Sequence, residues 1–250
     1  MLAEERYAAI LELLSRKGAA TISELAEAVG TSESTVRRDL GSLDKAGRLN
    51  KVHGGATALE SEFVSVERDV LTKESLNVEE KERIGAYAAG QVSDGDVIFL
   101  DAGTTTLHMA EHMTAVQATF VTNGIAHARV LNQRGCRVYL LGGLLKPTTE
   151  AIIGIGAVNS LKQFNFTKAF LGVNGVTAAQ GLTTPDIEEA LVKTAAAQRA
   201  YMVYALADHT KFNKVFAATI LPLDKACIIT DYLTDQSLSQ KTIIKEVDKL

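Results

Sequence analysis

The run of residues 21–57 most constrains the fold, because two helix starts and a basic stretch follow one another there. Thr21, with Glu24 three residues later, forms a capping box, and Ser32 can accept the first amides of the next helix. Apolar residues recur at helical spacing along three segments. The three stripes are Tyr7, Ile10, Leu11 and Leu14; Ile22, Leu25, Ala26 and Val29; and Val36, Leu40 and Leu43. This pattern predicts a small three-helix core, with Gly30 in the turn before the third helix.

The third predicted helix has an outward face that can read DNA. A step of about 100° per residue places Arg38 and Lys45 opposite the buried stripe and Arg37 on its flank. The arginine fork matches two acceptors on guanine in the major groove, and small hydroxyls reach base edges or phosphates. We therefore predict base or phosphate contacts for Arg37 and Arg38. The full predicted DNA-binding set is Ser34, Thr35, Arg37, Arg38, Lys45, Arg48, Lys51 and His53.

Residues 48–53, after Gly47, are predicted to form a short hairpin or wing. Arg48 and Lys51 would lie along the sugar-phosphate backbone, where they position the protein without reading sequence. Residues 1–57 have no net charge, but residues 37–53 hold five Lys and Arg against two Asp, a net of +3. This concentration of basic charge favours DNA binding. A winged helix that binds protein, with these charges as a solvated face, stays as an alternative.

The rest of the chain is long enough for one substantial α/β domain. Of the 250 residues, 46% are hydrophobic, and residues 58–250 carry a net charge of −4, which disfavours a second nucleic-acid surface. No apolar run approaches the roughly 18 residues of a membrane span. The N-terminus enters an amphipathic helix instead of a signal peptide. These features predict a soluble, cytoplasmic chain without membrane contact.

The sequence does not support metal or disulfide chemistry. Cys136 and Cys227 are too few and too isolated for a disulfide framework or a zinc site, and each is expected to be buried. His108 and His112 lie four residues apart on a predicted helix, but no third ligand is evident. We therefore predict neither a metal site nor a cofactor.

Three regions are predicted: the winged helix at residues 1–57, a connector at 58–76 and an effector domain at 77–250. The connector lacks a clean period, and Phe63, Val64 and Val66 are expected to dock locally. Asn77 and Glu80 predict the start of a helix over 78–92, and a second helix is predicted over 185–200. Strands are predicted at 97–100, 119–122, 137–141, 169–173, 202–205 and 227–229. Short apolar strands separated by helices indicate an α/β fold with a mostly parallel sheet covered on both sides.

The loops after these strands hold the predicted ligand site, because ligands of such sheets bind beyond the carboxyl ends of the strands. Residues 101–106 combine a carboxylate, a glycine and three threonines before a helix, whose N-terminus favours phosphate. The segment lacks the Gly-Lys-Ser/Thr of a nucleotide P-loop, so we exclude ATP. Amide, hydroxyl, carboxylate and lysine groups follow at 122–124, 142–143, 154–156, 174–175 and 208–211. Together they suit a small polyhydroxylated anion, and a sugar phosphate fits best.

Seven motifs occur in order along the chain: Thr-Val-Arg-Arg-Asp-Leu at 35–40, Val-His-Gly-Gly-Ala at 52–56, Asp-Ala-Gly-Thr-Thr-Thr at 101–106, Thr-Asn-Gly at 122–124, Leu-Gly-Gly at 141–143, Phe-Leu-Gly-Val-Asn-Gly at 170–175, and Ala-Asp through Lys-Phe at 207–212. In these motifs the whole chain resembles the DeoR-family transcriptional repressors of sugar metabolism. The resemblance implies a winged helix-turn-helix followed by a domain similar to ribose-5-phosphate isomerase. Lys51 departs from the family's usual Arg, and His209-Thr210 replaces its more usual pair of serines.

The resemblance also implies phosphate at the 101–106 loop, with Asn174, Asp208 and Lys211 facing the sugar. Lys193 is added to this site, whereas Glu188 and Glu189 are interpreted as helix-surface ion pairs. The predicted effector-binding set is Asp101, Gly103, Thr104, Thr105, Thr106, Thr122, Asn123, Gly142, Gly143, Asn174, Lys193, Asp208 and Lys211.

We therefore expect a ligand-responsive repressor of a sugar-utilisation operon, with operator DNA and a phosphorylated sugar as partners. One small recognition helix has limited affinity, so a homodimer or homotetramer is expected. Residues 181–186 resemble fructose-operon repressors, which implies fructose 1-phosphate. A sugar-phosphate isomerase is the rival, with Asp208 and Lys211 as an acid/base pair. Against it, Asn174 stands where the isomerases have carboxylates, and an amide cannot take a proton from carbon.

Overall fold

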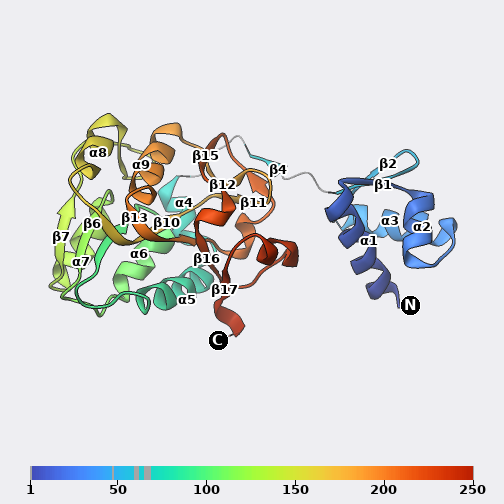
Figure 1. The fold of residues 1–250 in the computed structure, drawn as a ribbon, viewed down its shortest axis with the longest axis horizontal. Helices are drawn as coiled ribbons and strands as arrows, with labels where there is room; N and C mark the ends of the chain where they lie inside the picture. Colours follow the sequence, from blue (N-terminus) through green and yellow to red (C-terminus); the bar gives the residue numbers. More distant parts are fainter. Residues whose placement is uncertain (1, 47, 59–61, 65–68, 250) are drawn as a thin grey trace. The chain divides into compact units, whose positions relative to one another are not determined.

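The computed structural model describes residues 2–46, 48–58, 62–64 and 69–249. The chain divides into two compact units, residues 1–62 and residues 63–250 (Figure 1). Among the described residues, no helix is long and apolar enough to cross a membrane. Gly47 and Val66, for which a helix end and local docking were predicted, lie outside the described residues.

The N-terminal unit is a three-helix core with a small sheet. Its helices are α1 (Ala3–Lys17), α2 (Ile22–Val29) and α3 (Glu33–Lys45), and its antiparallel strands are β1 (Ala19–Thr21), β2 (Asn50–Val52) and β3 (Gly55–Thr57), in the order β1-β3-β2. The predicted capping box forms: Thr21 Oγ1 accepts from Glu24 N at 3.2 Å, and Thr21 N donates to Glu24 Oε2 at 2.8 Å. Ser32 Oγ accepts from Thr35 N, and Gly30 has a left-handed φ of 64°. The apolar stripes of the three helices form one buried cluster, as predicted.

Asp39 has a structural role in this unit. It is 3% exposed, and its carboxylate accepts from Arg6 Nε at 2.8 Å and from Arg6 Nη2 at 3.1 Å. This two-point ion pair ties α1 to α3. The negative charge of Asp39 therefore faces the core and does not offset the basic outer face of α3.

The second unit is built on a fully parallel sheet of seven strands, in the order β17-β16-β13-β10-β5-β6-β7. The strands are β5 (Val97–Leu100), β6 (Thr119–Thr122), β7 (Arg137–Leu140), β10 (Phe166–Gly172), β13 (Ala200–Leu206), β16 (Cys227–Thr230) and β17 (Ile244–Glu246). All six predicted strands are present. The edge strand β17 was not predicted, because its sequence, Ile-Lys-Glu, offers a single apolar residue.

Helices cover both faces of this sheet, as predicted. Figure 1 shows α5 and α6 on one side and α8 and α9 on the other. The helices are α5 (Val78–Ala89), α6 (Thr104–Glu111), α7 (Ile125–Gln133), α8 (Gly154–Leu161) and α9 (Ile187–Ala197). Successive side chains of β5 alternate between the two cores, since Phe99 belongs to one cluster and Ile98 and Leu100 to the other. The two layers hold the carboxyl ends of the strands in a fixed arrangement.

Shorter elements surround the sheet. An antiparallel sheet contains β11 (Gly175–Thr177), β12 (Gly181–Thr184) and β15 (Ala218–Leu221), and a hairpin pairs β8 (Leu144–Leu145) with β9 (Ile152–Ile153). The chain after β4 (Glu62–Phe63) runs beside β14 (Lys214–Val215), where Val64 N donates to Val215 O at 2.9 Å. Single 3-10 turns occur at His209–Lys211, Leu223–Lys225, Gln236–Gln240 and Val247–Lys249.

One local helix was not predicted, and one predicted helix cap was wrong. The predicted connector contains a helix, α4 (Val70–Ser75), whose first turn is capped by Asp69 Oδ1 accepting from Thr72 N at 2.8 Å. A helix of six residues is too short to show a helical period of apolar residues in the sequence. Asn77 does not cap α5 with its side chain; its φ is 51°, and its Nδ2 donates to Asp208 Oδ1 at 3.2 Å. Asn tolerates this left-handed backbone, so its side chain can hydrogen-bond to the distant Asp208 instead of capping the helix.

Candidate functional site

The outer face of α3 carries the residues predicted to meet DNA. Ser34, Arg37, Arg38 and Lys45 are exposed, and Thr35 is half-buried. Arg37 Nη2 lies 2.9 Å from Glu33 Oε2, so Arg37 already forms an ion pair within its own helix. The hydroxyls of Ser34 and Thr35 lie 2.9 and 3.0 Å from Ser32 Oγ and take part in the helix cap. Arg38 is therefore the better candidate of the two arginines for a base contact.

The predicted wing is a two-stranded hairpin formed by β2 and β3. Arg48, Lys51 and His53 are exposed on or beside it. Lys51 N donates to Asp44 Oδ1 at 2.9 Å, which fixes the wing to the end of α3. A Cβ at Gly55 would lie 2.2 Å from Ala20 O, so only glycine lets β3 approach β1 this closely.

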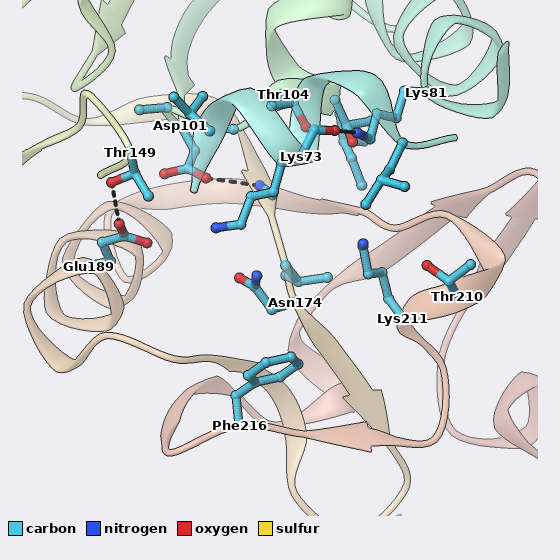
Figure 2. A pocket seen from close by; sticks show the side chains of 18 of the residues that line it. Lys73, Lys81, Asp101, Thr104, Thr149, Asn174, Glu189, Thr210, Lys211 and Phe216 are labelled. Atoms are coloured by element: carbon cyan, nitrogen blue, oxygen red, sulfur yellow. Dashed lines mark hydrogen bonds between the residues drawn. The ribbon is translucent and has the colours of Figure 1, made fainter. Parts of the chain in front are cut away.

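A polar cavity lies in the second unit, at the carboxyl ends of β5 and β10 (Figure 2). Its volume of about 150 Å³ is far above the roughly 10–15 Å³ that one water requires. Seven residues of the predicted effector set line it: Asp101, Gly103, Thr104, Thr105, Asn174, Lys193 and Lys211. The fold thus gathers residues from four separate segments around one cavity.

The loop after β5 forms one wall and ends in α6. Thr104 and Thr105 are the first residues of α6, so the cavity meets a helix N-terminus, where partial positive charge favours an anion. Thr106 Oγ1 donates to Asp101 O at 2.6 Å and accepts from Gly103 N at 2.9 Å. Thr106 therefore shapes the loop from behind instead of lining the cavity.

His127 supports the same loop and was not predicted. Its Nε2 lies 3.0 Å from Gly103 O and 3.1 Å from Thr106 Oγ1. Because a carbonyl can only accept, Nε2 carries the proton. Burial lowers the pKa of His127 to about 4, and the charge of Lys193 adds to the effect, so the ring is neutral near pH 7. The sequence could hardly predict this role, since a lone histidine on a helix belongs to no recognisable motif.

A buried ion pair joins this loop to α9. Asp101 is 1% exposed and contacts Lys193 Nζ, which is on a residue 5% exposed. The same carboxylate oxygen accepts from Gly172 N at 3.0 Å, at the end of β10. The pair therefore fixes three segments of the cavity wall relative to one another.

Cations outnumber carboxylates along the cavity. Lys73, Lys81, Lys193, Lys211 and Lys214 line it, against Asp101 and Glu189. Burial lowers the pKa of Lys81 to about 8, and the nearby charge of Lys211 contributes. An anion in the cavity would relieve this repulsion. The electrostatics therefore favour a negatively charged ligand.

The other predicted effector residues, all of them described, do not line the cavity. Asn123 Oδ1 accepts from Ala102 N at 2.9 Å, and Thr122 Oγ1 accepts from Gly124 N at 3.1 Å, so both shape neighbouring loops. Gly142 and Gly143 are exposed after β7, where a Cβ on Gly143 would lie 2.6 Å from Ile153 O. Asp208 is buried behind Lys211.

Several lining residues were not predicted: Lys73, Lys81, Thr149, Glu189, Thr210, Lys214 and Phe216. Glu189 was interpreted as part of a helix-surface ion pair, which was wrong. It is 7% exposed, and its Oε1 accepts from Thr149 Oγ1 at 2.7 Å (Figure 2). The same oxygen accepts from Lys146 Nζ at 3.1 Å. Its position three residues after the α9 cap, Asp186, is the one available sequence signal.

Comparisons with known proteins agree with both parts of the chain. Residues 6–62 match the DeoR-like helix-turn-helix domain, and residues 76–232 match the DeoR C terminal sensor domain. The uncharacterized HTH-type transcriptional regulator FruR of Bacillus subtilis is 41% identical over 251 residues, covering 99% of each chain. The lactose phosphotransferase system repressor of Staphylococcus aureus is 32% identical over 249 residues, covering 98% of each.

A solved structure of ribose 5-phosphate isomerase A from Methanocaldococcus jannaschii also matches, with a TM-score of 0.39 and 16% identity over 54% of this chain and 55% of that one. The family models together span most of the sequence, and the two regulators align along nearly their whole length. The chain therefore belongs to the DeoR family of helix-turn-helix transcriptional regulators.

Proposed function

We propose that this regulator represses a sugar-utilisation operon and that a phosphorylated sugar, bound in the cavity of the second unit, controls it. The observation that carries the proposal is the excess of lysines in a cavity bounded by the N-terminus of α6. Charge-assisted hydrogen bonds and a helix N-terminus suit a phosphate, and Asn174 and the threonines suit sugar hydroxyls. The names of the relatives, one a lactose phosphotransferase system repressor, support the same class of target.

Fructose 1-phosphate is the effector that we propose first. Its support is the resemblance of residues 181–186 to fructose-operon repressors, together with the name FruR of one uncharacterized relative. Binding without turnover is expected, because Asp208 is engaged by Asn77 and Thr210 and does not line the cavity. We further propose a homodimer or homotetramer, since two recognition helices on repeated half-sites bind more tightly than one.

A combined thermal-shift and operator-binding experiment tests this function. Fructose 1-phosphate, glucose 6-phosphate and unphosphorylated fructose are added separately to the full chain. We expect a phosphorylated sugar, and not fructose, to raise the melting temperature and to change the affinity for duplex DNA from its own promoter region. Failure of every sugar phosphate to do either would reject the sensor function. Salt-independent or absent DNA binding would instead favour a protein-binding winged helix.

Arg38→Ala should weaken specific operator binding by about 1 to 3 kcal/mol, roughly 5- to 150-fold, because a bidentate base contact is lost. Lys51→Ala should weaken all duplexes similarly and flatten the dependence on salt, because a phosphate contact is lost. Fluorescence anisotropy with operator and scrambled duplexes, at two salt concentrations, separates the two effects. Equal operator affinity for wild type and Arg38→Ala would remove Arg38 from the reading face.

The affinity for fructose 1-phosphate should fall as pH rises above about 8, the pKa of Lys81 in the folded protein. A bound dianion favours charged Lys81, so binding takes up a proton once the free lysine has lost it. Lys73, Glu74, Asp208 and Lys211 act on the same ammonium and do not change this sign. Calorimetric titration at pH 7 and pH 9 should show a loss of up to about tenfold. Lys81→Met should flatten the profile; an unchanged profile would show that Lys81 does not sense the ligand.

A further inference from the structure

Helix α4 forms part of the effector cavity although it precedes the matched sensor region. Val70, Lys73 and Leu76, in or directly after α4, line the cavity. The regions matched by the two family models end at residue 62 and begin at residue 76, so α4 lies between them. Among the described lining residues, Val64 alone comes earlier in the chain, so α4 is the helix of the cavity wall nearest in sequence to the DNA-binding unit.

Side chains of the cavity itself hold α4 in place. The Lys81 ammonium contacts the carbonyl oxygen of Lys73, and Val70 N donates to Thr148 O at 3.0 Å. The next residue, Thr149, donates to the buried Glu189. α4 is therefore tied to one lining side chain, Lys81, and to Thr148, the neighbour of the lining residue Thr149. A ligand that moves Lys81 or Thr149 can thus act on α4.

The wall formed by residues 208–211 contacts the end of the α4 segment through Asn77. Asn77 Nδ2 lies 3.2 Å from Asp208 Oδ1 and 3.4 Å from Thr210 Oγ1, and the ammonium of Lys211 lies 3.3 Å from Asp208 Oδ2. Figure 2 shows Lys73 and Lys211 extending into the cavity from different walls, with Asn174 between them. One anion held by both lysines would draw the two walls together.

We propose that Lys73 binds the anionic group of the effector together with Lys211, and that the occupied cavity holds α4 against the sensor unit. This inference rests on the proposed sugar-phosphate effector. A six-residue helix is not stable alone, and Leu71 on α4 is 73% exposed, so docking of α4 depends on a few contacts. A ligand that contacts α4 only in its docked position shifts the equilibrium toward docking. The chain that enters the sensor unit is already paired with β14 at β4 and Val64, and docked α4 then gives it a second fixed point.

Hydrogen exchange of the full chain, with and without saturating fructose 1-phosphate, tests the inference. Two peptide regions are compared: residues 69–76 for α4, and residues 101–107 for the loop after β5 together with the first turn of α6. In the wild type, the ligand should slow exchange at both regions by at least about fivefold. In Lys73→Gln the slowing should persist at 101–107 and disappear at 69–76, because α4 no longer carries the ammonium that binds the ligand. The variant keeps the backbone carbonyl that Lys81 contacts, so α4 should still dock without ligand as in the wild type. Leu71→Ala, an exposed change on the same helix, should behave as the wild type.

The outcomes distinguish this inference from the function on which it rests. If the ligand slows exchange at 101–107 but not at 69–76 of the wild type, the sensor function stands and the role of α4 is overturned. Equal slowing at 69–76 in the wild type and Lys73→Gln would also overturn it. If fructose 1-phosphate protects neither region, that effector assignment fails together with the inference. We also expect fructose 1-phosphate to change the operator affinity of Leu71→Ala but not of Lys73→Gln.

Discussion

Asp101→Ala should lower the free energy of unfolding of the sensor unit by about 3 to 5 kcal/mol, because it leaves the ammonium of Lys193 buried without its carboxylate. Glu189 also faces Lys193, and its attraction places the expected loss toward the lower end of this range. For a unit of this size, the loss corresponds to a fall in melting temperature of roughly 6 to 20 °C. Differential scanning calorimetry of the full chain measures it.

The double variant Asp101→Ala with Lys193→Met is the matched control. It removes both charges, so it should recover a large part of the stability lost in the single variant. Equal instability of the single and double variants would assign the loss to the hydrogen bond from Gly172 N and to packing instead. The transition of the N-terminal unit should stay unchanged in both, since neither residue belongs to it.

Local chemistry explains why the N-terminal unit could be predicted so fully from its sequence. Thr21 and Glu24 satisfy each other within one turn, and the apolar stripes of three short helices can meet in one small core. The count of charged residues in this region was a poorer guide to its DNA-binding face. Asp39 was counted against DNA binding, but it pairs with Arg6, which lies 33 residues earlier on another helix. A count of charges does not show which face of a helix each one occupies.

The cavity could be predicted only where strand ends supply its walls. Asp101 and Asn174 follow parallel strands, and the topology brings such ends to one edge of the sheet. Lys73 and Lys81 belong to α4 and α5, which carry no strand-end signal. Asn77 has the sequence of a helix cap, yet its side chain bonds Asp208, 131 residues away. Tertiary contacts of this kind override local preference and leave no trace in the spacing of residues.

Lys211→Ala should weaken fructose 1-phosphate binding by about 10- to 150-fold, because a charge-assisted hydrogen bond to the phosphate contributes roughly 1.5 to 3 kcal/mol. Lys211 lines the cavity and sits on a short 3-10 turn held by Asp208, whose Oδ1 accepts from Thr210 N at 3.0 Å. That bond does not involve the lysine side chain, so the turn should persist in the variant. Lys225→Ala, which changes an exposed lysine outside the cavity, is the control.

Without effector, Lys211→Ala should bind operator DNA as the wild type does, because Lys211 belongs to the other unit. A ligand shifts a two-state equilibrium only through its differential affinity, so the variant should need proportionately more sugar phosphate to change operator binding. Electrophoretic titration of operator complexes against fructose 1-phosphate measures this shift for wild type, Lys211→Ala and Lys225→Ala. Superimposable curves for all three would show that Lys211 does not bind the effector. Loss of DNA binding in Lys211→Ala alone would instead give it a role in the fold or the oligomer, since a contact made only to the effector cannot alter the unliganded state.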